Sequence, residues 1–404
     1  MGEPRTPRIS DIRHMRICGD KNTYCGHPRQ GGLFDFGDGH LALVHNHAPC
    51  AYQKREDVQH DFHGYHARSV QLLQRSFDGG ETWPESENVV VFRESDDIER
   101  RREFLGRCAP GVPRDEMSLR ASGSCIYFGR TWAGEPDERG TPGLVCFSIR
   151  SADCGRTWED IPTVIHPPVG FYDLRKDNHP LVAMPDGTYL GAMVATHGRE
   201  GVPDDFGGRF LTGAVHLYGS DDEGISWAHL AEIARDPTGR GRCSYPGLLL
   251  LPSGRLQCYV LNIYGRCNAL MLSESENGYE WTQPRSIVRW GASPWAPRRQ
   301  PGAYGGSFLY RSPWPMVLAD GRILVLFGRR RVPYGIGAIV SDDAGATWSN
   351  ELILRDDGNC DDLGYNVATQ LPDGRIFTAY YFTGGDKNSF GGSRHIAGTF
   401  FRLD

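Results

Sequence analysis

A phrase of eight residues recurs along the sequence and constrains the fold more than any other feature. Its pattern is Ser-x-Asp-x-Gly-x-Thr-Trp, present in four copies and in a worn fifth copy with Glu276 at the expected place of the Asp. Asp and Ser side chains suit hydrogen bonds to a turn's own amides, Gly suits a positive φ, and Trp packs over a hairpin. We interpret each copy as a structural turn and not as a catalytic motif. The copies are Ser76–Trp83, Ser151–Trp158, Ser220–Trp227, Ser275–Trp281 and Ser341–Trp348.

A second periodic signal lies ahead of each phrase: an X-Gly pair between two apolar runs, which is the strongest short-range indication of a β-hairpin. Six such pairs occur, and the last is followed only by the C-terminal segment. Six turns indicate six units of about four strands, the sheet size of a propeller blade. The pairs are Asp38-Gly39, Ser122-Gly123, Asp186-Gly187, Ser253-Gly254, Asp320-Gly321 and Asp373-Gly374.

The sixth unit is one strand short. Its apolar runs cover residues 367–382 and 395–401, and residues 9–17 offer the missing strand. A ring that both chain ends close within one blade removes an exposed sheet edge. We therefore predict an all-β fold: one six-bladed β-propeller domain over residues 1–404. Its four-stranded antiparallel blades would be closed by the N- and C-terminal strands.

Composition agrees with many short strands and limits the partners. The chain has 51 Gly and 26 Pro residues, no sustained helical periodicity and no apolar run long enough to span a bilayer. The net charge of −6 is mild and mixed, so nothing indicates nucleic-acid or membrane binding. The expected partner is a carbohydrate, and the oligomeric state stays open.

The cysteines and the N-terminus bear on the compartment. Eleven cysteines are scattered without metal-type pairs, which is typical of free thiols in a reducing compartment. Cys18 and Cys25 could form a disulfide, but nothing in the sequence requires one. Residues 1–16 lack the apolar segment of a secretory signal. We expect a cytoplasmic protein, unless a signal is missing from this sequence.

The turn phrases, the six units and the C-terminal ending resemble the sialidase (neuraminidase) superfamily, in which the repeat is called the Asp box or BNR repeat. The resemblance covers nearly the whole chain. It is specific for the fold and less so for activity, because Asp boxes also occur in non-catalytic proteins. It implies a site on the propeller axis, formed by residues that enter the innermost strand of each blade.

The resemblance implies roles for three residues. Arg29, nine residues before Asp38 (38−29), takes the place of the first-blade Arg that holds the substrate carboxylate. Tyr365, eight residues before Asp373 (373−365), takes that of the Tyr that attacks the anomeric carbon. Asp61 lies on the long loop on which the family carries its acid/base Asp. A surface Arg, a core Tyr and a solvated loop Asp are the structural alternatives.

Other positions depart from the family. Tyr245 stands where sialidases place the Glu that acts as base to the Tyr, and Asn262 stands near the expected second Arg. For the third Arg, the candidates are Arg311 and the run that contains Arg329 and Arg330. Successive residues of a strand point to opposite faces, so at most one or two of that run can face the axis.

Several residues are candidate replacements. Asp115 and Asp177 enter the second and third blades, where a carboxylate could act as a base or accept from sugar hydroxyls. His45 and His47 follow the first strand pair and could face the axis as sugar partners or bases. His-x-His is also a metal-ligand spacing. No third ligand is legible, so we expect neither a metal nor a cofactor.

Three functions are compatible with these residues. The first is an exo-acting glycoside hydrolase, a sialidase-like enzyme that releases a terminal acidic sugar with Tyr365 as nucleophile, Asp61 as acid/base and Arg29 on the carboxylate. The second is a related enzyme for another sugar: an arabinose or rhamnose exo-hydrolase, or a lyase for uronic-acid polysaccharides. The third is a non-catalytic glycan-binding propeller, which would have no reason to keep Arg29, Tyr365 and the loop acid together.

Overall fold

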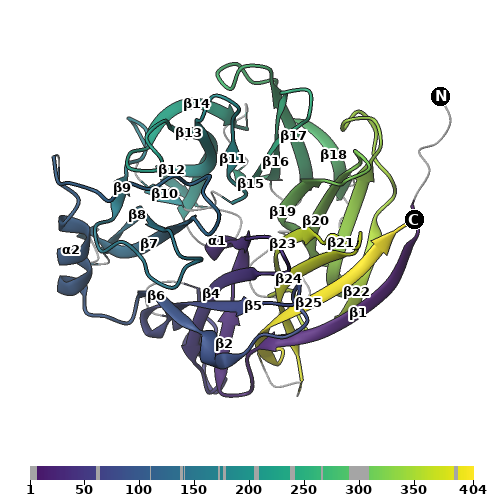
Figure 1. Cartoon of the computed structure of the whole chain (residues 1–404), viewed down its shortest axis with the longest axis horizontal. Helices are drawn as coiled ribbons and strands as arrows, with labels where there is room; N and C mark the ends of the chain where they lie inside the picture. Colours follow the sequence, from purple (N-terminus) through teal and green to yellow (C-terminus); the bar gives the residue numbers. More distant parts are fainter. Residues whose placement is uncertain are drawn as a thin grey trace.

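Six β-sheets stand in a ring around a central axis, and successive sheets follow one another along the chain (Figure 1). The predicted six-bladed β-propeller is confirmed. In this computed structural model none of the described helices is long and apolar enough to cross a membrane. The structure describes residues 7–60, 64–109, 111–136, 140, 142–171, 173–175, 179–203, 209–236, 242–264, 267–290, 309–385 and 390–404.

The first three blades contain strands β2 to β14. The first blade holds β2 (Thr23–Gly26), β3 (Leu33–Asp35), β4 (Leu41–Pro49), β5 (Val70–Ser76) and β6 (Val89–Arg93). The second holds β7 (Cys125–Pro136), β8 (Pro142–Ser151) and β9 (Thr163–Ile165). The third holds β10 (Asp173–Arg175), β11 (Val182–Ala183), β12 (Tyr189–Pro203), β13 (Arg209–Ser220) and β14 (Ala228–Ala234).

The other three blades each form a four-stranded sheet. The fourth holds β15 (Arg242–Leu250), β16 (Leu256–Tyr264), β17 (Cys267–Ser275) and β18 (Arg285–Trp290). The fifth holds β19 (Tyr310–Val317), β20 (Ile323–Arg329), β21 (Tyr334–Ser341) and β22 (Leu352–Gly358). The sixth holds β23 (Gly364–Gln370), β24 (Ile376–Gly384), β25 (Ser393–Leu403) and β1 (Ile9–Cys18).

The inner edges of the first three blades depart from a single straight strand. In the first blade, helix α1 (Pro28–Gly31) separates β2 from β3, and both strands pair with β4. In the third blade, β10 and β11 likewise pair separately with β12. The second blade is a three-stranded sheet in the described part of the chain, where residues 111–124 precede β7 without forming a strand.

Few helices accompany the sheets. Helix α2 (Ile98–Gly106) lies at the periphery of the ring (Figure 1), and its Phe104 packs on Phe147 with ring centroids 5.3 Å apart. Its N-cap Asp97 accepts from the Arg100 amide at 2.9 Å, as Asp does at helix starts. The remaining helices are short 3₁₀ segments: η1 (Arg55–Asp57), η2 (Tyr65–Arg68) and η3 (Glu85–Glu87).

Strand β1 closes the ring as the sequence predicted. It pairs antiparallel with β25, from Ile9 opposite Leu403 to Cys18 opposite Ile396. The two chain ends therefore share one blade (Figure 1). The pairing gives β25 a partner on both sides, so its amides and carbonyls do not form an exposed edge.

The recurring turns each precede the outermost strand of a blade, in five of the blades, and their hydrogen bonds follow the predicted chemistry. In the first copy, the Asp78 carboxylate accepts from Ser76 Oγ at 2.7 Å and from the Thr82 amide at 2.9 Å. The Gly80 amide, at positive φ, donates to Ser76 Oγ at 2.8 Å. Trp83 Nε1 donates to the Gly80 carbonyl at 2.9 Å, which folds the indole back over the turn.

The structure corrects the expectation that Glu276 replaces the Asp in the degenerate copy that is fourth along the chain, Ser275–Trp281. Asn277, and not Glu276, takes the place of the Asp, because its Oδ1 accepts from the amides of Tyr279 and Glu280 at 2.9 Å each. The acceptor must stand two residues after the serine to reach these amides. Glu276 points elsewhere and accepts from Arg255 at 2.7 Å.

These turns also join neighbouring blades. A side chain of one blade donates to the turn of the next blade in four places around the ring. The bonds run from Arg375 to Glu81 (2.8 Å), from Arg75 to the Cys154 carbonyl (3.2 Å), from Arg150 to the Glu223 carbonyl (3.1 Å) and from Gln257 to the Ala344 carbonyl (2.8 Å). In these four blades the repeat therefore fixes the blade against the preceding one as well as shaping a hairpin.

Removal of residues 1–18 tests the ring closure. We expect the free energy of unfolding to fall by about 3 kcal/mol or more, because half-buried Ile9, Met15 and Ile17 leave the core. We also expect self-association, because β25 becomes an exposed edge. Urea denaturation and size-exclusion chromatography measure both effects. Removal of residues 1–7 is the control, and equal behaviour of the two truncated chains would contradict the closure.

Candidate active site

The innermost strands of the fourth, fifth and sixth blades share one backbone feature, a β-bulge. Each contains a bulge where its register with the second strand shifts. At each bulge a non-glycine residue adopts a left-handed conformation: Tyr245 (φ 56°), Ser312 (φ 53°) and Tyr365 (φ 58°). This conformation costs about 1–2 kcal/mol for an L-residue, and such strain concentrates at functional sites.

The bulges bring Tyr245, Arg311 and Tyr365 together. Arg311 Nη2 donates to the Tyr365 hydroxyl at 2.5 Å. The same guanidinium lies 4.0 Å from the centroid of the Tyr245 ring and 4.8 Å from that of Tyr365. The two tyrosine rings meet edge to face, with centroids 5.7 Å apart. A cation is thus held between two aromatic rings and against one phenolic oxygen.

The first blade adds His27 and Arg29 to this cluster. His27 has a left-handed backbone (φ 57°) and is the N-cap residue of α1. Its ring meets the Tyr365 ring at 82°, with centroids 4.5 Å apart, and its Nδ1 is hydrogen-bonded to the Tyr65 hydroxyl at 2.6 Å. Arg29 donates to the Pro246 carbonyl, next to Tyr245. The first and fourth blades therefore meet through α1.

Burial sets the electrostatics of this site, which we call the axis cluster: His27, Arg29, Tyr245, Arg311 and Tyr365. These residues are between 0% and 8% exposed. Burial lowers the pKa of His27 well below its usual range, and His60 and His66 act in the same direction. The imidazole is therefore neutral near pH 7, and the same burial opposes its protonation.

A buried carboxylate stands behind the axis cluster. Asp362 accepts from the Tyr381 hydroxyl at 2.6 Å and from Arg394 Nε at 2.9 Å. Arg330 donates to the Tyr381 hydroxyl at 2.7 Å. Burial opposes ionisation of Asp362, but His60 and Arg394 outweigh it and hold the pKa of this carboxyl well below its usual range. The network fixes the Tyr381 ring, whose centroid lies 5.6 Å from that of Tyr365.

The arginines of the fifth blade divide between two sides of the sheet. Arg330 reaches Tyr381 and the Leu363 carbonyl, beside the axis cluster. Arg329 lies 3.2 Å from Glu351, to which Arg331 also donates, and is not brought to the tyrosines. The alternation of side chains along an extended chain explains this split. Arg311 and Arg330 are the candidates that the fold places at the site.

His45 and His47 are not brought to the axis cluster. His45 is fully buried, its Nε2 hydrogen-bonded to Gln74 Oε1 at 2.9 Å. The residue between the two histidines, Asn46, instead has its Nδ2 3.4 Å from His66 Nδ1, on the side of His27. The expectation that His45 and His47 face the axis is wrong, because alternation on β4 turns Asn46 to that side.

The predicted acids have different outcomes. Asp115 is exposed, and its carbonyl oxygen accepts from Arg150 of β8 at 3.1 Å. The structure does not bring it to the axis cluster, because no inner strand forms there. Asp61 and Asp177 lie outside the described residues. His60, next to Asp61, is hydrogen-bonded to the Tyr24 hydroxyl at 2.8 Å.

Sequence reasoning missed His27, Tyr381, Asp362 and Arg394. A signal existed for two of them: His27 stands two residues before Arg29, and Asp362 three residues before Tyr365. Tyr381 and Arg394 belong to the second and third strands of the sixth blade, for which no register argument was available.

Comparisons with known proteins support the fold. No protein-family model matches the sequence, and no curated protein matches it. A protein of unknown function from Dyadobacter fermentans is similar with a TM-score of 0.67 and 20% identity, over 97% of this chain and 99% of that chain. The K499G mutant of NanB sialidase from Streptococcus pneumoniae is similar with a TM-score of 0.55 and 12% identity, over 92% of this chain and 68% of that chain. Trypanosoma rangeli sialidase in complex with sialic acid is similar with a TM-score of 0.54 and 12% identity, over 97% of this chain and 59% of that chain.

The chain thus spans 59% of the length of the Trypanosoma rangeli chain. At identities of 20% and below, these likenesses concern the fold. The chain has the six-bladed propeller of the sialidases, as a divergent representative of that fold.

The buried carboxyl of Asp361 allows a test of how burial beside the axis cluster affects stability. Burial raises its pKa to about 6, against the opposing effect of Arg330. The unfolded value is about 3.9, so the folded chain binds the proton more tightly and loses stability as pH rises from about 4 to 6. We expect Asp361→Asn to stabilise the protein by up to about 3 kcal/mol at pH 7. The gain should vanish below about pH 4.

Urea denaturation at several pH values measures this effect. Asp356→Asn, at an exposed position of β22, is the control. A gain that is equal at acidic and neutral pH would contradict the assignment of the effect to ionisation of Asp361.

Proposed function

We propose that this protein is an exo-acting glycoside hydrolase that releases a terminal acidic sugar, sialic acid or a related sugar, from a glycan or oligosaccharide. The observation that carries the proposal is the 2.5 Å hydrogen bond from Arg311 to the Tyr365 hydroxyl within the buried axis cluster. It joins a nucleophile suited to an acidic sugar with a cation suited to the sugar's carboxylate.

Tyr365 would act as the nucleophile. A carboxylate nucleophile would be repelled by the carboxylate of the substrate, whereas a neutral phenol is not. A phenol is weak at its ordinary pKa of about 10 and requires activation. Arg311 supplies it in this proposal, because a guanidinium that donates to the phenolic oxygen favours the phenolate. This contact would compensate for Tyr245 at the position where sialidases have a glutamate base.

Arg29 and Arg311 would bind the substrate carboxylate. Both residues are at most 6% exposed, so their charges are little screened by water. Arg29 donates to the neutral Pro246 carbonyl. A substrate carboxylate is a stronger acceptor, and its bonds to a guanidinium are charge-assisted and often bidentate. Arg330, which donates to Tyr381, would add a third positive charge to this binding site.

Asp61 remains the proposed acid/base residue. What supports this proposal is its neighbour His60, which lies 2.8 Å from the Tyr24 hydroxyl and 3.4 Å from Asp362. Asp177 in the third blade stays a candidate for binding sugar hydroxyls.

One observation favours a second function, the cleavage of a uronic-acid polysaccharide by elimination. His27 is neutral and hydrogen-bonded to Tyr65, and both arginines stand within the same cluster. Elimination requires a Tyr or His base and a cation that neutralises the uronate. An exo-hydrolase for a neutral sugar and a glycan-binding propeller without turnover are further outcomes of the test below.

Tyr365→Phe tests the nucleophile. Removal of the phenolic oxygen should lower turnover of a fluorogenic aryl sialoside by at least about 1,000-fold. Tm should change little, because the ring stays in place. Tyr310→Phe, at an equally buried tyrosine of β19 outside the axis cluster, should retain activity. Full activity in Tyr365→Phe would remove the nucleophile assignment.

Substrate panels separate the alternatives. A wild-type protein inactive on sialosides but active on uronate polymers, with a rise in ultraviolet absorbance from a new double bond, would replace hydrolysis by elimination. Tight binding on a glycan array without any turnover would replace both by a binding function.

A further inference from the structure

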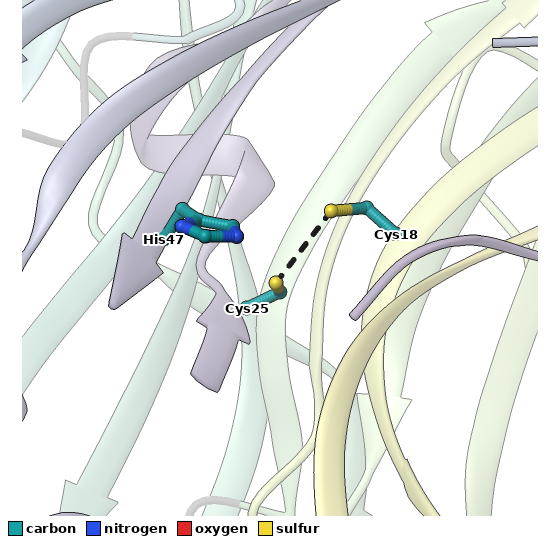
Figure 2. Close-up of side chains that lie close together, drawn as sticks. All are labelled: Cys18, Cys25 and His47. Carbon is teal, nitrogen blue, oxygen red and sulfur yellow. Dashed lines mark hydrogen bonds between the residues drawn. The ribbon is translucent and has the colours of Figure 1, made fainter. Parts of the chain in front are cut away.

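Cys18, Cys25 and His47 form a cluster outside the axis cluster, and neither the fold nor the proposed function uses it. Figure 2 shows the three side chains turned toward one another. Their two sulfur atoms and one imidazole nitrogen all lie within 4.8 Å of one another. The two sulfur atoms are 3.7 Å apart. We call this group the thiol–imidazole site.

Three strands supply these side chains: β1 of the sixth blade and the neighbouring strands β2 and β4 of the first blade. Cys25 of β2 and His47 of β4 are direct partners in the antiparallel ladder, so their side chains share one face of the sheet. Tyr24, the neighbour of Cys25, points to the opposite face, where its ring stacks on Tyr65 at 3.9 Å. Cys18 is the last residue of β1 and comes from the sixth blade.

Gly19 holds Cys18 against Cys25. Its φ is 108°, which L-residues with a side chain rarely adopt. A Cβ at this position would lie 3.0 Å from His395 Cα and 3.2 Å from Cys25 Sγ. The chain therefore passes too close to Cys25 for any residue larger than glycine, and this close passage brings the two sulfur atoms together.

The spacing of the ligand atoms fits a tetrahedral metal ion. Zinc binds sulfur at about 2.3 Å, so two sulfur ligands at the tetrahedral angle lie about 3.8 Å apart. The observed separation of 3.7 Å is close to that value, whereas the sulfur atoms of a disulfide are only about 2.05 Å apart. The imidazole also distinguishes the two cases, because a disulfide has no use for His47 and a zinc ion does.

We propose that Cys18, Cys25 and His47 bind one thiophilic divalent ion of the zinc type. Three protein ligands leave the fourth tetrahedral position to water. Cys18 and His47 are half-buried while Cys25 is fully buried, so the ion reaches the site from the side of Cys18 and His47. His45 is not a ligand in this proposal, since its two nitrogens are hydrogen-bonded to the Asn46 carbonyl and to Gln74.

The bound ion would fasten the ring at its closure. It would join the end of β1, the outermost strand of the sixth blade, to the two inner strands of the first blade. A ligand that binds only the folded state stabilises it in proportion to the logarithm of ligand concentration over Kd. The ion therefore adds a coordinate link where the chain ends are otherwise joined by strand pairing.

Cobalt and zinc titrations of the reduced full-length chain test the proposal. After treatment with a chelator, Co²⁺ should bind with one equivalent and give thiolate-to-cobalt charge-transfer absorption with the visible bands of a tetrahedral site. Zn²⁺ should displace it and raise Tm. Cys18→Ser and His47→Gln, both half-buried, should each weaken binding by at least about 10-fold and abolish the zinc-dependent rise in Tm.

Two variants serve as controls. Cys146→Ser removes a buried thiol of the second blade, and His40→Gln removes a histidine of the first blade outside the site; both should bind as the wild type does. Unchanged cobalt spectra in both ligand variants, or no thiolate absorption in the wild type, would overturn the proposal. Peptide mapping that finds Cys18 and Cys25 joined as a disulfide in the isolated protein would overturn it in favour of a redox pair.

Discussion

The pairing of β1 with β25 is the constraint on which the other contacts depend. Every blade is covered on both faces by its neighbours, so an open ring would leave the first and sixth blades with one bare face each. At the junction, the first turn is held from two sides, because Glu81 accepts from Arg375 of the sixth blade and from Arg13 of β1. The same junction brings Cys18 to Cys25 and His47. Closure of the ring thus also sets the geometry of the thiol–imidazole site.

The ring also determines how chemistry is concentrated on the axis. A regular inner strand would present its side chains to the two faces of its own blade. A bulge with one left-handed residue redirects them toward the centre, at the cost of local backbone strain. Tyr245, Ser312 and Tyr365 repeat this device in three successive blades, and His27 reaches a similar conformation ahead of α1. The strained backbone is held by the packed blades around it.

Buried charge gives the axis cluster its chemical character. Arg311 lies between two tyrosine rings, and Arg29 crosses to the fourth blade, so the centre of the propeller carries positive charge beside phenols. Asp362 compensates Arg394 and approaches Arg330 behind this layer, at 2.9 Å and 4.0 Å. The charge of Asp362 is therefore balanced by arginines behind the layer that holds Tyr365.

The sequence by itself determined the number of blades, the closing strand and the nature of the turns, because these depend on local spacing and turn chemistry. It also offered Arg29 and Tyr365 as candidates from their distances to a hairpin turn, and Arg311 as one of several candidate arginines. Only the tertiary structure decided which face of a strand meets the axis: Asn46 turns inward in place of His45 and His47, and Asp115 stays in solvent because its blade lacks an inner strand. It alone brought Asp362 behind Tyr381, and Cys18 to Cys25. Side-chain contacts between separate strands depend on how the blades pack against one another, which no local pattern encodes.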